Sequence, residues 1–75
     1  MKKIIHFHIY KGESQYIAEG IGIPVVTEGK TLDELAANIE EAVGLALEGE
    51  DLADFGLAPN PSVLMTFEFP AVAHA

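Results

Sequence analysis

The stretch of sequence that decides the fold is residues 30–49, which reads KTLDELAANIEEAVGLALEG. Thr31 and Glu34 have the spacing of a capping box, in which the threonine hydroxyl accepts from the amide of the glutamate and the glutamate side chain reaches back. Asp33 suits the positive end of the helix dipole. We therefore predict a helix over about 32–48.

Apolar side chains recur along this helix at three- and four-residue spacing, which places them in one stripe. The acidic side chains lie mostly away from the stripe, so we expect the stripe to pack on a sheet while the carboxylates face water. After the helix, 51–61 is predicted as a loop with one turn around Leu52 to Phe55. The stripe consists of Leu32, Leu35, Ala36, Ile39, Ala42, Val43 and Ala46.

Outside the helix, the chain shows the two-residue alternation that is typical of β-strands. The predicted strands are 3–10, 15–19, 23–27 and 62–69, and 71–75 is predicted to be a mobile tail. Pro24 cannot donate to a ladder, so the third strand should lie at a sheet edge. In the first strand, Ile5, Phe7 and Ile9 alternate with Ile4, His6, His8 and Tyr10.

These elements predict an α+β fold with the order β-β-β-α-β, in one domain over residues 1–75. A helix that covers one face carries the chain back over the sheet, which places the last strand beside the first and parallel to it. The expected strand order is therefore 3-2-1-4. The sheet face that the helix does not cover is too apolar to remain fully exposed to water in so small a protein. We expect that face, or the edge of the last strand, to hold a partner or to form a homodimer or higher homo-oligomer.

Charge and composition limit the partners of the chain. The net charge is −8, and residues 31–75 carry nine acidic residues and no basic one, so a basic protein would be attracted to that half. Without arginine the chain lacks the usual bidentate reader of phosphate, and we expect no direct binding to nucleic acid. The absence of cysteine favours a cytoplasmic location. No apolar run approaches the length of a membrane span.

Two histidines supply the one candidate metal pattern. His6 and His8 lie on one face of the first strand, about 7 Å apart from the strand rise. A zinc site needs a third or fourth ligand, for which Glu68 or His74 would have to converge on the pair. We favour an interfacial role for both rings over metal binding, and we predict no metal and no cofactor.

The remaining polar residues do not suggest a reaction centre. Glu34, Glu40 and Glu41 are predicted on the solvent side of the helix, with no apolar pocket around them. No serine or threonine is accompanied by an identifiable base and orienting group, so we predict no catalysis. The residues that we expect to bind a partner are Glu34, Glu40, Glu41, His6, His8 and Tyr10.

Several segments taken in order resemble the HicB-like antitoxin family. They are Tyr16-Ile17-Ala18-Glu19, Ile23-Pro24, the run TEGKTLDEL over 27–35 and the run NIEEAV over 38–43. The resemblance implies a partial ribonuclease-H-like sheet. It also implies a protein that masks a small basic toxin, itself of a double-stranded-RNA-binding-like fold, which cleaves messenger RNA.

The chain departs from the family pattern at two points. Pro24 is followed by Val25 where members typically have glycine, so we expect a plain strand in place of a loop. Complete antitoxins also append a DNA-binding domain, for which this chain is too short, so no direct DNA binding is expected. The alternative to an antitoxin function is a stand-alone oligomeric domain that binds a small ligand or metal through the face carrying His6 and His8.

Overall fold

The computed structural model describes residues 2–49, 52–69 and 71. The order of elements confirms the predicted β-β-β-α-β arrangement, with a short 3-10 helix where one turn was expected. The bounds of the first two strands differ from the prediction by one or two residues, as strand ends commonly do. The elements are β1 Lys2–Lys11, β2 Tyr16–Ile21, β3 Val26–Gly29, α1 Leu32–Ala46, η1 Leu52–Phe55 and β4 Leu57–Phe67.

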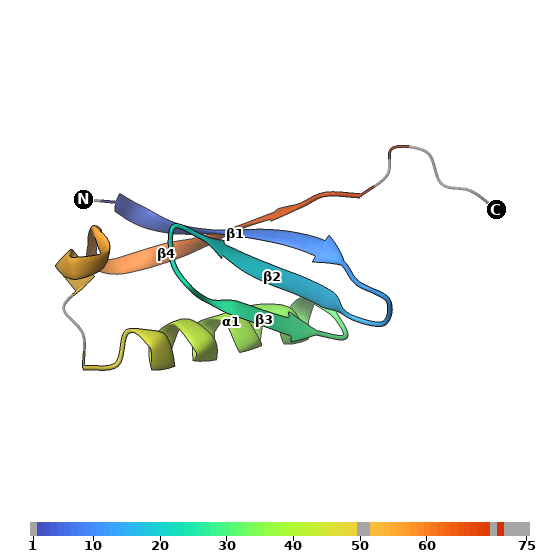
Figure 1. The fold of residues 1–75 in the computed structure, drawn as a ribbon, viewed down its shortest axis with the longest axis horizontal. Helices are drawn as coiled ribbons and strands as arrows, with labels where there is room; N and C mark the ends of the chain where they lie inside the picture. Colours follow the sequence, from blue (N-terminus) through green and yellow to red (C-terminus); the bar gives the residue numbers. More distant parts are fainter. Residues whose placement is uncertain (1, 50–51, 70, 72–75) are drawn as a thin grey trace.

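The four strands form one sheet in the predicted order, β3-β2-β1-β4. β1 pairs antiparallel with β2, and β2 pairs antiparallel with β3. β4 returns to pair parallel with β1, in a register that places Ile5 beside Val63 and Ile9 beside Phe67. The chain reaches β4 through α1 and η1, and β4 is one of the two edge strands (Figure 1).

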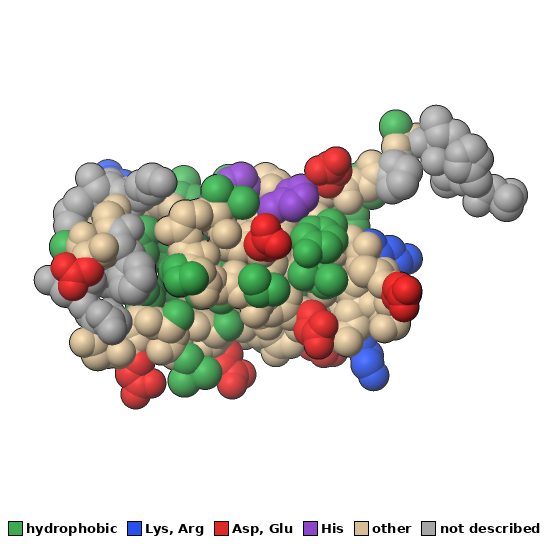
Figure 2. All heavy atoms as spheres, viewed as in Figure 1, with side chains coloured by type: hydrophobic (Ala, Val, Ile, Leu, Met, Phe, Trp, Pro, Cys, Tyr) green, Lys and Arg blue, Asp and Glu red, His purple; other side chains and the backbone are tan. Residues whose placement is uncertain are grey.

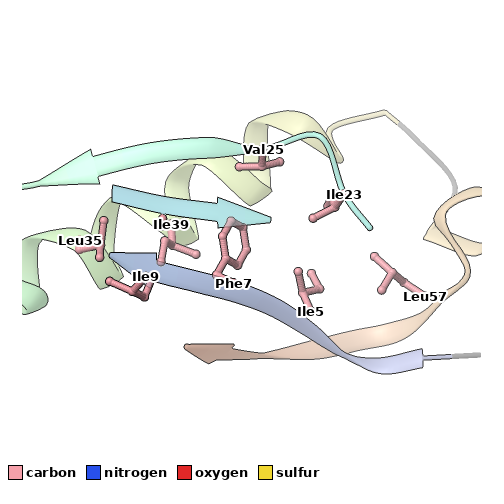
Figure 3. Close-up of a cluster of buried hydrophobic side chains, with 9 residues drawn as sticks. Ile5, Phe7, Ile9, Ile23, Val25, Leu35, Ile39 and Leu57 are labelled. Carbon is pink, nitrogen blue, oxygen red and sulfur yellow. The ribbon is translucent and has the colours of Figure 1, made fainter. Parts of the chain in front are cut away.

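The core lies between the sheet and α1, as the close-up in Figure 3 shows. Phe7 and Ile9 of β1 and Leu35 and Ile39 of α1 are its largest fully buried side chains. The alternation of β1 is therefore confirmed, with one set of side chains inward and the other outward. Ile5, Ala18, Ile23, Val25 and Leu57 complete the buried core.

α1 begins where the sequence predicts, because the amide of Glu34 donates to the Thr31 hydroxyl oxygen at 3.0 Å. It ends at Ala46, two residues before the predicted end, and Gly49 then takes a positive φ of 74°. The buried stripe is narrower than predicted, since Leu32 and the alanines at 36 and 46 are exposed. In the described part of the chain, no helix has the length and apolar character needed to span a membrane.

The predicted third strand over 23–27 is wrong in its position, because β3 starts only at Val26. The amide of Val25 donates to the Ile23 carbonyl at 2.8 Å, which closes a tight turn around Pro24. Gly20 makes this turn possible, since a Cβ there would lie 2.6 Å from the Ile23 carbonyl oxygen. The expectation of a plain strand after Pro24 is therefore also wrong.

β4 starts five residues before the predicted 62, within the segment predicted as a loop. Two prolines fit in this strand because it lies at the sheet edge and its register with β1 shifts between Lys2 and Ile4. Asn60, between the prolines, takes a φ of 53°. The amide of Glu68 still donates to the Ile9 carbonyl at 3.2 Å, so the ladder continues one residue beyond the strand. The predicted tail lies outside the described residues apart from residue 71.

Candidate protein-binding surfaces

Among the described residues, no element covers the sheet face opposite α1, and this face carries both apolar and polar side chains. β1 contributes Ile4, which is 50% exposed, together with the two histidines. β4 contributes Leu64, which is 47% exposed. Figure 2 shows the histidine side chains among hydrophobic side chains, with acidic side chains close by. Such a face is a candidate for burial against another protein.

His6 is held by the neighbouring strand. Its Nε2 lies 2.8 Å from the Thr66 hydroxyl oxygen, within hydrogen-bond distance. The same hydroxyl lies 3.5 Å from the carbonyl oxygen of Phe7 on β1. The His6 ring therefore links β1 to β4 across the open face.

His8 has different neighbours. Its Nε2 lies 3.5 Å from Glu68 Oε1, and its ring centre lies 5.8 Å from that of Tyr10. The pair is ionic only when His8 is protonated, and the Glu68 side chain is 79% exposed, so we expect little stability from it. His8, Tyr10 and Glu68 border a shallow hollow with Lys11, Phe67 and Phe69.

The two histidines thus face separate partners rather than a common centre. Across residues 2–49, 52–69 and 71, no group of three or more histidine, cysteine, aspartate or glutamate side chains is arranged to hold a metal ion. His74, the second ligand considered from the sequence, lies outside the described residues. Within the described residues, therefore, no third side chain joins His6 and His8 as a metal ligand.

The three glutamates of α1 do not share one surface. At about 100° per residue, Glu34 and Glu41 fall on the same flank of the helix and Glu40 on another. Glu41 borders a hollow with Thr27 of β3, whereas Glu40 borders a groove next to β4. All three are exposed. The six predicted partner-binding residues are therefore divided between two flanks of the helix and the opposite face of the sheet.

The groove between α1 and β4 was not predicted from the sequence. It has a volume of about 530 Å³ and exists because α1 contacts β3 and β2 but does not extend over β4. Three apolar side chains at alternate positions of β4, at 63, 65 and 67, were a signal that one short helix could not cover the whole face. The lining residues are Ala36, Ile39, Glu40, Pro61, Val63 and Met65.

Comparison with known proteins adds no relative: no family model, curated protein or solved structure matches the chain with significance. The resemblance to the HicB-like family therefore depends on the segments quoted from the sequence. The most specific part of the resemblance, residues 29–42, covers the last residue of β3, the turn before α1 and the first three turns of the helix.

Proposed function

We propose that the chain is a HicB-like antitoxin-type module, which binds and masks a small basic toxin that cleaves RNA. In this role it acts by binding alone, without catalysis and without direct contact to DNA, in the cytoplasm. The observation that carries the proposal is the combination of exposed carboxylates on α1 with uncovered apolar surface on the sheet.

Charge supports a basic partner. Residues 31–75 contain nine acidic residues and no basic one, and Glu34, Glu40 and Glu41 are all exposed on α1. A concentrated negative field accelerates the approach of a positively charged protein and discourages nucleic acid. Apolar side chains such as Ile4 and Leu64 would then supply contacts that hold the partner once it has docked.

The arrangement of polar groups supports binding rather than catalysis. The two histidines of the open face are engaged with Thr66 and Glu68, and these contacts are exposed to solvent. General acid–base chemistry needs a proton-transferring group next to a site that can hold a substrate. The hollow beside His8 is shallow and open, which suits a protein surface better than a small substrate.

The first test co-expresses the chain with a small basic protein encoded by a neighbouring reading frame. Toxicity of that protein alone, rescue of growth by the chain, and co-purification of the two are the expected results. Failure of the chain to bind or rescue would contradict the proposal.

A charge variant then tests the mechanism. Replacing Glu34, Glu40 and Glu41 together by glutamine should slow association with the basic partner about tenfold at low salt and weaken its salt dependence. The matched control replaces three exposed glutamates outside α1, at positions 13, 19 and 28, and removes the same charge. Stopped-flow kinetics compares the two triple variants. Equal rates for both would show that α1 does not steer the partner.

A further inference from the structure

The outer edge of β4 offers backbone groups for another strand. Within the described residues, β4 pairs with β1 alone. The amide of Glu68 points toward β1, where it meets the Ile9 carbonyl. Because backbone groups alternate along a strand, the N–H and C=O groups of Val63, Met65 and Phe67 point away from β1. These are the unpaired groups of an edge strand.

The side chains at this edge are also incompletely buried. Val63, which lines the groove beside α1, is 42% exposed, and Phe69, two residues beyond the end of β4, is 70% exposed. The Phe69 ring lies 5.7 Å from that of Phe67, which in turn packs 5.5 Å from Tyr16. An apolar edge and an apolar groove therefore lie next to each other.

We propose that the outer edge of β4 is a homodimer interface, in which a second copy of the chain adds its own β4 antiparallel, centred on Met65. In this register Met65 faces Met65 of the second copy, and Val63 faces its Phe67. Leu64 faces Thr66, and Ser62 faces Glu68. The two sheets become one continuous sheet with a two-fold axis, the closed arrangement that homodimers favour.

The proposed register keeps like charges apart at this edge. Between Ser62 and Phe69 the one ionisable side chain is Glu68, and the register places it opposite the neutral Ser62. No like charges are therefore directly opposed, although each chain carries a net charge of −8. The prolines at 59 and 61 end the pairing, since proline has no N–H to donate.

The same register also brings an aromatic ring to the end of the groove. Phe69 of the second copy comes to lie opposite Pro61, which lines the groove together with Ile39, Val63 and Met65. The exposed ring thus gains an apolar site, and the two-fold axis repeats the contact on the other side. A partner that contributes both a strand and an apolar ring at this spacing is supplied by the chain itself.

A cysteine placed on the proposed axis tests the register. The chain has no cysteine, so Met65→Cys introduces a single thiol that would face its own copy, with Cα atoms about 5.5 Å apart. That separation suits a disulfide. In Val63→Cys the two thiols would lie about 14 Å apart along the strands, too far to bridge.

We expect Met65→Cys to form a disulfide-linked dimer rapidly in oxidised glutathione, and Val63→Cys to remain largely uncrosslinked. Gel electrophoresis without reductant measures both variants. Equal crosslinking of the two variants, or none with Met65→Cys, would overturn the proposed register.

Sedimentation of the unmodified chain supplies a second test. We expect a species of twice the chain mass, and we expect Val63→Pro, which deletes an outward N–H, to raise the dimer dissociation constant about tenfold or more. Val63→Ile keeps both the N–H and an apolar β-branched side chain, and it should dimerise like the original chain. A monomer at all concentrations, or indifference to Val63→Pro, would contradict the interface.

Salt separates this inference from the proposed function. Dimerisation brings two acidic chains together, so added salt should strengthen it, whereas salt should weaken binding of a basic toxin. A salt-strengthened dimer without toxin binding would remove the proposed function and leave the dimer. A dimer weakened by salt would count against the β4 pairing.

Discussion

The two edge strands of the sheet, β3 and β4, differ in how far other elements of the chain cover them. β3 has four residues, and α1 lies against it so closely that a Cβ on Gly29 would come within 2.7 Å of the Leu35 backbone nitrogen. The side-chain amide of Asn38 also donates to the Glu28 carbonyl of β3 at 2.7 Å. β4 has eleven residues and lies beyond the reach of α1.

This difference shows how a chain of 75 residues distributes a limited core. One helix of fifteen residues covers the β3 half of the sheet, and the β4 half keeps an apolar surface and an exposed edge. A small domain leaves a large share of its surface in water, so a second chain is the natural source of the missing cover. The β3 half should therefore govern folding, and the β4 half should govern association.

The largest expected effect is in the covered half. Leu35→Ala removes a fully buried side chain and should lower the free energy of unfolding by about 2–5 kcal/mol. Val63→Ala on β4 is the matched control and should change it by less than about 1 kcal/mol in the monomer. Urea denaturation at low protein concentration measures both. Equal losses would mean that Val63 also packs into the core of the single chain.

A smaller effect is expected where α1 meets the edge of β3. Asn38→Ala leaves the Glu28 carbonyl without its side-chain donor and should cost about 0.5–1.5 kcal/mol of unfolding free energy. Glu40→Ala, on the other flank of α1, should have less effect, because it is exposed and faces the groove. If both substitutions lower the free energy of unfolding by the same small amount, the hydrogen bond from Asn38 does not hold α1 against β3.

The sequence was sufficient where local chemistry determines structure. Thr31 caps α1 as predicted, the alternation through β1 separates the two faces of the sheet, and the strand order follows from the crossover rule. Prediction from the sequence failed where contacts between distant segments determine the structure. The turn around Pro24 depends on close approach to Gly20, and β4 tolerates two prolines because its outer edge is unpaired among the described residues.

The candidate surfaces were predicted in part. The open face with His6 and His8 follows from strand alternation, but their contacts with Thr66 and Glu68 depend on the parallel register of β1 and β4. The groove beside β4 depends on where α1 lies across the sheet, which periodicity does not determine. Helical spacing identified the side chains that face the sheet, but it could not show which strands they meet.

Amide hydrogen exchange, measured residue by residue at two protein concentrations, tests most directly whether the β4 half governs association. The amides of Leu64 and Thr66, directed at β1 by the strand alternation, should be protected at both concentrations. Those of Val63, Met65 and Phe67 should become protected only at the higher one. Rapid exchange of these three amides at both concentrations would contradict the account.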